Sequence, residues 1–443
     1  MHLLEAFGLK RGEAWAFVGA GGKTSAMFAL AKALAPPVVL TTTTHLGAWQ
    51  AGLADVNHLI ESKDGLNQVN FNQPRVILIT GPTGEDNRLA GLPDEALGLL
   101  CQRCIEKNLP LLIEADGARQ RPLKAPAPYE PVIPDWVTGV VVMAGLTGIG
   151  HPLDAKTVHR PEIFADISGC ALGEPITSEH LQQVLASDQG GFKGVPKNAQ
   201  CILFLNQAEG AHFQEVGFRL ARGLLNAYHR VLVGSLYEPT QAGSIFSLHT
   251  ETAGVILAAG ASERLGRPKQ LLDWNGVPFV RQVALNAIAA RLSPVIAVTG
   301  ADREGVERAL AGLEVTCVHN TDWAKGQSTS MQAGLAALPE DADSALFLLS
   351  DQPQIGPDLI KQLLERYAVN RQPITAPMMH GQRGNPVLFS SEIFDALSAV
   401  NGDRGGRAVF GQFKVDWLDW LDDRLLMDVD VPGDYERLLE AYF

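Results

Sequence analysis

Residues 254–272, GVILAAGASERLGRPKQLL, combine an apolar run with a loop of small residues and three cations, among them Arg264 and Lys269. The small residues at 258–261 would let backbone N–H groups approach a triphosphate closely, as in other anion-binding turns. Arg264 and Lys269 follow this loop, and they can neutralise phosphate oxygens in a chain whose formal net charge is −13. The segment therefore predicts a strand that opens into a binding loop for a phosphate-bearing substrate.

Acidic residues that could hold a metal ion follow a second apolar run and recur near residue 430. Asp351 comes directly after ALFLLS, and Asp428 and Asp430 lie in MDVDVP. Ligands of open parallel sheets bind at the carboxyl ends of strands, which would bring Asp351 beside the loop. We therefore predict that Asp351, with Asp430 or Asp428, binds Mg²⁺ through carboxylate oxygens. The alternative for Asp351 is a turn or helix-capping role before Pro353.

These segments resemble the MobA-like nucleotidyltransferases, whose first motif runs LAxGxSxRMGxxK, with Leu265 here in place of Met. GQRGNPVLF, NGDRGGR and MDVDVPGDYERL match later motifs of that family, so the resemblance covers essentially the whole second half. Ala259, where guanylyl-transferring relatives usually carry Gly, is typical of the molybdenum cofactor cytidylyltransferases. The resemblance implies that the terminal phosphate of molybdopterin attacks the α-phosphorus of CTP and that pyrophosphate leaves.

The resemblance also implies roles for individual residues. Such transfers need positioning and charge neutralisation more than a covalent nucleophile. Arg264 and the loop amides are expected on the β- and γ-phosphates, Lys269 on the charge that develops at the α-phosphate, and Asp351 on the metal. Further nucleotide-binding residues are expected to be Leu257, Ala258, Ala259, Gly260, Ser262, Gly266 and Ser328. Candidates for the pterin and its phosphate are Arg383, Asn385, Asp403 and Arg407. Gly and Pro surround these four residues, so simple turns are the alternative.

A second strand, glycine-rich loop and helix are predicted at residues 15–34. Gly19, Gly21 and Gly22 precede Lys23 and Thr24, and P-loop proteins use such a loop to cradle phosphates and a hydroxyl to recruit Mg²⁺. The spacing is more compact than GxxxxGK[ST], whose first Gly would fall on residue 17. The alternative is a tight strand-to-helix turn, which leaves the Lys-Thr pair unexplained.

Polar residues follow two more apolar runs in this half. Glu114 and Asp116 end LLIEAD, where the second metal-coordinating acid of a P-loop fold belongs; loop-capping acids are the alternative. Asn206 opens NQAE, which is only loosely similar to the NKxD base-reading loop of GTPases. The sequence thus predicts a nucleotide site in this half, with ATP or GTP and Mg²⁺ as ligands.

VGAGGKT, TTTTH, IEADGA with PLKAP, EPVIP, VHRPE and LNQ resemble the YqeC-type selenium-dependent hydroxylase accessory proteins over residues 1 to about 240. That resemblance implies an accessory role in the maturation of a molybdenum hydroxylase client, and it identifies no reaction. Fusion to a cofactor cytidylyltransferase would let both halves serve one cofactor. Two further interpretations remain open: a guanylyltransferase or sugar-phosphate nucleotidyltransferase, and a nucleotide-gated chaperone that carries the finished cofactor.

The elements that must position these residues alternate short apolar runs with longer helical patterns, which is typical of parallel sheets covered by helices. The predicted class is α/β, with a P-loop-like domain over residues 1–248 and a Rossmann-like nucleotidyltransferase domain over residues 249–443. The 443 residues include 46% hydrophobic residues but no unbroken run of about 20, so no membrane span is expected. The net charge argues against nucleic-acid binding, and five cysteines argue for a reducing, cytoplasmic location.

Overall fold

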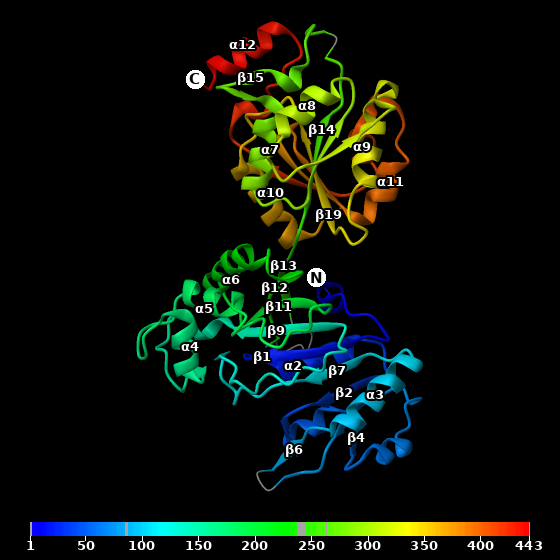
Figure 1. Ribbon diagram of the computed structural model, residues 1–443, viewed down its shortest axis with the longest axis vertical. Coiled ribbons are helices and arrows are strands. Elements are labelled where there is room, and N and C mark those ends of the chain that lie inside the picture. The colour runs from blue at the N-terminus through cyan, green and yellow to red at the C-terminus, as the bar shows by residue number, and fades with distance from the viewer. Residues whose placement is uncertain (1, 85–86, 237–243, 263, 443) are drawn as a thin grey trace. The chain divides into compact units, whose positions relative to one another are not determined.

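The computed structural model describes residues 2–84, 87–236, 244–262 and 264–442, and for residues 403 and 404 it describes the backbone only. The chain divides into two compact units, Met1–His249 and Thr250–Phe443. Each unit is an α/β structure built on one large sheet, as the alternating pattern predicts (Figure 1). No helix among the described residues is long and apolar enough to cross a membrane.

The first unit is built on a nine-stranded sheet in the order β13-β12-β11-β9-β1-β7-β2-β5-β4. The strands in that order are β13 (Ser244–Thr250), β12 (Arg230–Ser235), β11 (Gln200–Asn206), β9 (Gly139–Gly145), β1 (Ala14–Gly19), β7 (Leu111–Glu114), β2 (Val38–Thr42), β5 (Val76–Thr80) and β4 (Val56–Leu59). The pairings from β12 through to β4 are all parallel, so the carboxyl ends of these strands share one edge. The parallel sheet predicted for this half is confirmed.

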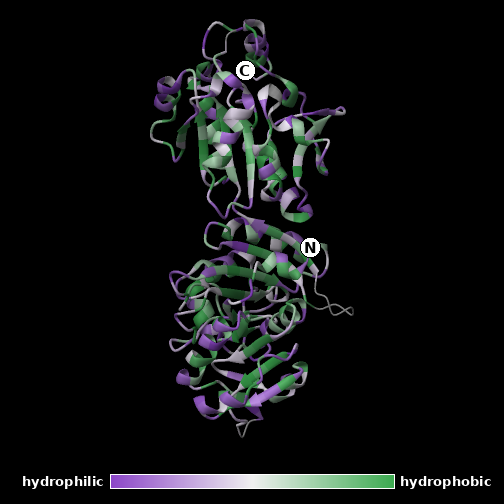
Figure 2. Ribbon diagram, turned by 90° about the vertical axis from the view of Figure 1, so that its right-hand side faces the viewer, coloured by the Kyte–Doolittle hydropathy of each residue, from purple (hydrophilic) through white to green (hydrophobic). Residues whose placement is uncertain are grey.

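Helices cover both faces of this sheet because its strands are apolar on both sides. Within β1, Trp15 and Phe17 pack into one core cluster, and Ala16 and Val18 pack into the other. The helices are α1 (Leu3–Phe7), α2 (Lys23–Ala33), α3 (Asp94–Glu106), α4 (Pro161–Ser168), α5 (Ser178–Ala186) and α6 (Ala211–Leu224). Short strands β3 (His45–Gly47), β6 (Arg88–Ala90), β8 (Leu123–Lys124) and β10 (Val158–His159) form two small sheets. Figure 2 shows the hydrophobic colour gathered on the strands.

The second unit has an eight-stranded mixed sheet in the order β18-β17-β14-β19-β22-β20-β21, with β23 paired to β20. The strands are β18 (Thr316–His319), β17 (Val295–Thr299), β14 (Ala253–Ala258), β19 (Ser344–Leu349), β22 (Val387–Ser390), β20 (Ile374–Met379), β21 (Gln382–Arg383) and β23 (Val415–Asp419). The first four are mutually parallel, and β22 runs antiparallel to β19. The helices are α7 (Phe279–Ala289), α8 (Arg303–Leu310), α9 (Gln327–Ala336), α10 (Pro357–Asn370), α11 (Phe394–Ser398) and α12 (Pro432–Glu440), and a hairpin joins β15 (Asp273–Trp274) to β16 (Val277–Pro278).

The segment at the boundary between the two units is partly strand. Its residues 244–250 form β13 at the edge of the first sheet, where residues 245 and 247–249 are buried, and residues 237–243 lie outside the described part of the chain. Cys101 and Cys104 lie in α3, and burial raises the pKa of the Cys101 thiol to about 11 and that of Cys104 to about 12. Both thiols are therefore neutral packing groups.

Candidate functional site

The loop that follows β14 is fixed at both ends. Ala301 N donates to Ala259 O at 3.1 Å, and a Cβ on Gly300 would lie 2.5 Å from that same oxygen, so the loop lies tightly against the end of β17. Ser262 has a left-handed φ of 56°, and its Oγ accepts a hydrogen bond from Lys269 N at 3.0 Å. A Cβ on Gly260 would meet no atom within 4 Å. The loop therefore has a fixed shape and one open side.

Lys269 joins the two acidic segments of this unit. Its Nζ forms an ion pair with Asp351 Oδ2, just beyond the end of β19, and lies 3.4 Å from Asp430 Oδ1. Burial opposes the charge of Lys269, but the carboxylates of Asp351 and Asp430 together outweigh burial and raise the pKa of Lys269. Arg264 lies at the rim, 81% exposed, with its Nη1 3.7 Å from Asp430 Oδ2. The structure therefore brings the predicted cations and acids to one place.

Two buried glutamines tie the segment around residue 428 to the end of β19. Gln352 Nε2 donates to Asp428 Oδ1 at 2.6 Å, and Gln354 Nε2 donates to Met427 O at 2.7 Å. Partial burial and the nearby Asp351 carboxylate raise the pKa of Asp428. The Oε1 atoms of both glutamines are buried and have no hydrogen-bond partner among the described residues. Gln352 thus holds Asp428 near Asp351 and keeps one free oxygen beside the acids.

The donor set suits a magnesium ion. No group of three or more metal-binding side chains is pre-assembled in the described part of the chain. Mg²⁺ does not need one, because it binds through one or two carboxylates and takes its other ligands from water and substrate phosphates. Asp351 and Asp428, or Asp351 and Asp430, would supply those carboxylates. Ser328, buried in the first turn of α9, lies beyond the end of β18.

Two cationic side chains of the predicted acceptor site lie close enough to influence each other. Burial, and then the charge of Arg407, lower the pKa of Arg383, whose guanidinium stacks 4.4 Å from the Phe410 ring centroid. The 3₁₀ segment Gly402–Val409 packs on α9, since a Cβ on Gly405 would lie 2.6 Å from Gln327 Oε1. Asn385 precedes β22, and the side chain of Asp403 lies outside the described part. Among the described residues, no hydrogen bond or ion pair links this cluster to Lys269.

In the first unit, the loop between β1 and α2 approaches β9 so closely that only glycine fits. Gly19, Gly21 and Gly22 have φ values of 89°, 79° and 120°, where side chains are strained. A Cβ on Gly19 would lie 2.2 Å from Met143 O, and one on Gly21 would lie 2.4 Å from Gly145 N. α2 begins at Lys23, as predicted, so the first N–H groups of the helix point out of the loop.

Thr24 and Glu114 meet beside this loop. Thr24 Oγ1 donates to Glu114 Oε2 at 2.7 Å, and burial raises the pKa of Glu114. Both residues line a pocket of about 690 Å³ together with residues 21–23. A hydroxyl and a carboxylate in contact at a helix start suit a Mg²⁺ ion that accompanies a phosphate group.

Family models match both units: a model described as MobA-like NTP transferase domain matches residues 254–416, and one described as YqeC protein matches residues 15–162. Uncharacterized protein YqeC of Escherichia coli (strain K12) is 33% identical over 205 residues, which span 45% of this chain and 77% of that protein. Nicotine blue oxidoreductase of Paenarthrobacter nicotinovorans is 34% identical over 197 residues, which span 42% of this chain and 95% of that protein. The chain joins a YqeC-family unit to a MobA-like unit.

A third relative bears on the chemistry of the MobA-like unit. Molybdenum cofactor cytidylyltransferase of Escherichia coli (strain K12) is 26% identical over 192 residues, which span 42% of this chain and 95% of that protein. The MobA-like unit is a nucleotidyltransferase. Both resemblances stated from the sequence motifs are confirmed.

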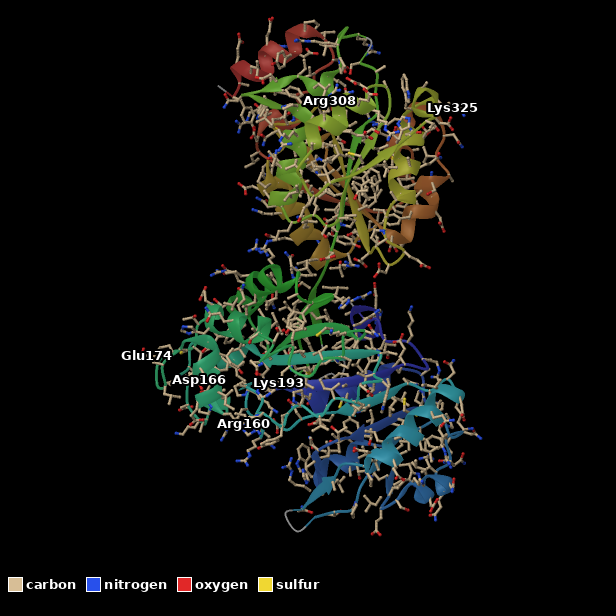
Figure 3. All side chains as sticks on the ribbon, viewed as in Figure 1. Arg160, Asp166, Glu174, Lys193, Arg308 and Lys325 are labelled. Carbon is tan, nitrogen blue, oxygen red and sulfur yellow. The ribbon has the colours of Figure 1, made fainter. Side chains whose placement is uncertain are left out.

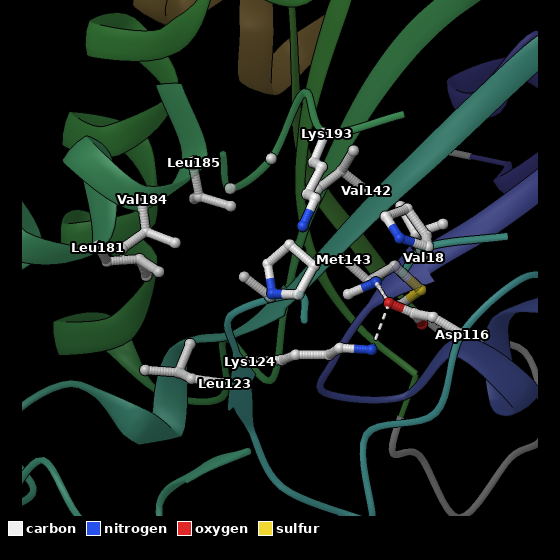
Figure 4. A pocket seen from close by; sticks show the side chains of 16 residues that line it. Val18, Asp116, Leu123, Lys124, Val142, Met143, Leu181, Val184, Leu185 and Lys193 are labelled. Atoms are coloured by element: carbon white, nitrogen blue, oxygen red, sulfur yellow. Dashed lines mark hydrogen bonds and ion pairs between the residues drawn. The ribbon is translucent and has the colours of Figure 1, made fainter. Parts of the chain in front are cut away.

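Asp116 of the YqeC unit contacts the glycine loop and two lysines. Its Oδ2 accepts from Gly19 N at 3.0 Å and from Lys124 Nζ at 2.7 Å, and its Oδ1 lies 3.1 Å from Lys23 Nζ. Figure 4 shows Asp116 beside Lys124; both residues line a small cavity, and neither lines the 690 Å³ pocket. Lys124 also pairs with Glu130 at 2.7 Å. From these contacts we propose that Asp116 positions Lys23 within a buried ion network, instead of the metal-binding role that the sequence predicts.

Asn206 is also placed differently from the base-reading role. Its Nδ2 donates to Gly21 O at 2.6 Å, and its Oδ1 accepts from Leu236 N at 3.0 Å. Because backbone groups occupy both polar atoms of the side-chain amide, Asn206 stabilises the glycine loop through its hydrogen bond to Gly21. The next residue, Gln207, does line the pocket.

Several residues that the sequence motifs did not single out belong to these sites. Gln352 in the MobA-like unit carried a signal only as part of DQP, and Lys124 in the YqeC unit only as part of PLKAP. The arginines at 88, 119 and 121 and Trp49, which line the pocket, carried none. Lys124 links through Glu130 to Arg160, whose guanidinium makes two hydrogen bonds of 2.7 and 2.9 Å to that carboxylate. Figure 3 labels Arg160 among the side chains of this unit.

Changing Lys23 to Ala should weaken phosphate binding by the YqeC unit and leave nucleotidyl transfer by the MobA-like unit largely intact, because each site lies within its own unit. The loss should be about tenfold or more, the usual worth of a charge-assisted contact. Calorimetric titration with Mg·ATP and Mg·GTP, beside a transfer assay, checks both statements. Equal losses in both assays would contradict the separation of the sites.

Changing Gln352 to Ala should lower kcat/KM for transfer by about 10-fold and raise the Mg²⁺ concentration needed, because Asp428 would lose the donor that orients it. Nucleotide-dependent binding of Mn²⁺, followed by electron paramagnetic resonance, gives a readout apart from turnover. Gln362→Ala, at an exposed position of α10, is the matched control. An unchanged Mg²⁺ concentration for half-maximal transfer would mean that Gln352 is a packing residue and does not orient Asp428.

Proposed function

We propose that the MobA-like unit transfers CMP from CTP to the terminal phosphate of molybdopterin and releases pyrophosphate. The arrangement of Lys269 between Asp351 and Asp430, at the end of an open-sided loop, is the observation that carries this proposal. This arrangement supports the proposal because a triphosphate on the loop would present its α-phosphate to a cation and to carboxylates that can bind a metal ion.

Different residues of this unit are proposed to contact different phosphates of the triphosphate. Loop amides at residues 259–260 and the exposed Arg264 would bind the β- and γ-phosphates in the ground state. Lys269, held by Asp351, would face the α-phosphate and neutralise the charge that grows there. Mg²⁺ on Asp351 and Asp428 or Asp430 would supply further charge neutralisation for the departing pyrophosphate. The attacking phosphate is already ionised, so no general base is needed.

The acceptor would lie toward the paired arginines. Burial, and then the nearby charge of Arg407, lower the pKa of Arg383, and an anion between the two guanidinium groups would offset their repulsion. A pterin phosphate is such an anion. Asn385 and Ser328 are the neutral groups proposed to contact the acceptor and the nucleotide, respectively.

Cytosine is proposed as the base because Ala259 replaces the Gly usual in guanylyl-transferring relatives. The Ala259 side chain is buried against Gly300, so its effect on base choice would act through the position of the loop backbone. The relative named as a molybdenum cofactor cytidylyltransferase supports the same choice.

The test is incubation of the full chain with Mg²⁺, molybdopterin and each nucleoside triphosphate in turn, with the dinucleotide and pyrophosphate identified by mass spectrometry. CTP should give the highest kcat/KM. A higher value for GTP would reassign the unit as a guanylyltransferase. Absence of pyrophosphate with every triphosphate would reject the transfer reaction.

For the YqeC unit we propose binding of a nucleotide phosphate group, with Mg²⁺, at residues 21–25 and Glu114, and an accessory role toward a molybdenum hydroxylase client. The Thr24–Glu114 pair and the glycine loop support the phosphate site. Capture of a molybdenum hydroxylase by the full chain, lost in Lys23→Ala, would support the accessory role. Equal capture by the variant would contradict a nucleotide-dependent association.

A further inference from the structure

We infer that the 690 Å³ pocket of the YqeC unit binds a nucleoside triphosphate whose phosphates lie between α2 and three arginines and whose base stacks on Trp49. This inference rests on the proposed phosphate site at residues 21–25, and it adds the ligand class and the residues that select it. A pocket of this size falls within the range of small-molecule sites, about 300–1,000 Å³.

The charge of the pocket lining points to a polyanion. Lys23, Arg88, Arg119 and Arg121 line it, and Glu114 is its one carboxylate among the described residues. Lys23 is held by Gly19 O and Asp116, and one nitrogen of Arg88 donates to His45 O at 3.1 Å. The guanidinium groups of Arg119 and Arg121 have no hydrogen-bond or ion-pair partner in the part of the chain that the structure describes. In a chain of net charge −13, such unpaired cations favour a ligand with several negative charges.

The loop at residues 117–121, which carries Arg119 and Arg121, is hydrogen-bonded to the phosphate loop at residues 19–23. Gly21 N donates to Arg121 O at 3.2 Å, so the two loops keep a fixed spacing. Arg119 and Gln120 have left-handed φ values of 48° and 60°, a backbone conformation that non-glycine residues rarely adopt in succession. Strained backbone of this kind persists where the surroundings enforce it, most often at binding sites. The loop therefore presents its two arginines toward the ligand of the phosphate loop.

Trp49 supplies the apolar face of the pocket. It lies in the 3₁₀ helix Ala48–Leu53 and is 67% exposed although it is the largest side-chain type. A Cβ on Gly47 would lie 2.9 Å from Trp49 Nε1, so Gly47 leaves the space that the indole occupies. Gly47 N donates to Gln50 Oε1 at 2.9 Å, which fixes the turn beneath the ring. An exposed indole held beside unpaired cations suits a planar heteroaromatic ring linked to phosphates.

The test uses the full chain carrying Arg264→Ala and Lys269→Ala, which weaken the nucleotide site of the MobA-like unit. ATP, GTP, tripolyphosphate and adenosine are titrated in Mg²⁺ by calorimetry. ATP or GTP should bind, tripolyphosphate should bind more weakly, and adenosine should not bind measurably. Trp49→Leu should lower nucleotide affinity by roughly 10- to 100-fold and leave tripolyphosphate affinity unchanged. Trp49→Phe should retain most of the nucleotide affinity.

Arg119→Ala and Arg121→Ala should each lower the affinity for ATP, GTP and tripolyphosphate by about 10-fold. The matched controls are Arg75→Ala, an exposed arginine of the same unit, and Leu53→Ala, on the same 3₁₀ helix as Trp49 but outside the pocket lining. Full nucleotide affinity in Trp49→Leu, with binding lost in Lys23→Ala, would overturn this inference and leave the proposed phosphate site standing. No binding of any phosphate compound by the parent protein would overturn both.

Discussion

Replacing Asp351 by Asn should lower the turnover of nucleotidyl transfer by roughly 10³-fold while the affinity for CTP changes little. The carboxylate is buried, carries the ion pair with Lys269, and is one of the two acids proposed for the metal. A metal contact that neutralises the departing pyrophosphate strengthens as the reaction proceeds, so its loss falls on turnover. Asn keeps the shape of the side chain, and steady-state kinetics beside calorimetric CTP titration separate the two effects.

Arg264→Ala is the matched contrast, because the exposed Arg264 would contact the triphosphate already in the ground state. It should mainly raise the KM for CTP, and Lys269→Ala should lower turnover, though less than Asp351→Asn does. Asp341→Asn, an exposed acid outside the site, controls for the charge change. Near-normal turnover in Asp351→Asn, with an unchanged circular dichroism spectrum, would make Asp351 a turn residue and move the metal to Asp428 and Asp430.

The strands and both binding loops could be predicted because their signals are local. Apolar runs of five to seven residues became β1, β2, β5, β9 and β14, and glycines at close backbone approaches marked the loop after β1. Lys269 and Asp351 could be placed together because both follow parallel neighbouring strands. The proximity of Lys269 and Asp351, which form an ion pair, is therefore predictable from the sequence.

Contacts between distant segments could not be predicted in the same way. Gln352 and Asp428 are 76 positions apart, and no periodicity relates them. Glu114 and Asp116 are two positions apart, which in a strand would place both carboxylates on one face, but β7 ends at Glu114. The chain leaves the sheet there, so Glu114 reaches Thr24 while Asp116 turns toward Lys23 and Lys124. Arg88 lies in β6, whereas Arg119 and Arg121 lie in the loop between β7 and β8, and the three arginines form no sequence motif.

The position of Asp116 leads to the second large effect. Asp116→Asn should destabilise the YqeC unit by about 3–5 kcal/mol, because removing one partner of a buried ion pair leaves uncompensated charge. The side chains of Lys23 and Lys124 are 4% and 1% exposed, so water cannot replace the lost carboxylate. Urea unfolding, with hydrogen exchange of β1 and β9 amides to report on this unit, measures the change. Asp135→Asn, at an exposed position of the same unit, should change stability by less than about 0.5 kcal/mol.

A second substitution separates this role from metal binding. Lys124→Met in the Asp116→Asn background removes one of the two cations that lose the Asp116 carboxylate, and Glu130, which loses its pair with Lys124, keeps its two hydrogen bonds from Arg160. The double variant should therefore be more stable than the sum of the single changes predicts, by about 1–3 kcal/mol, as expected for residues in one network. Additive effects, or an Asp116→Asn protein of normal stability whose nucleotide binding has lost its dependence on Mg²⁺, would return Asp116 to the metal site.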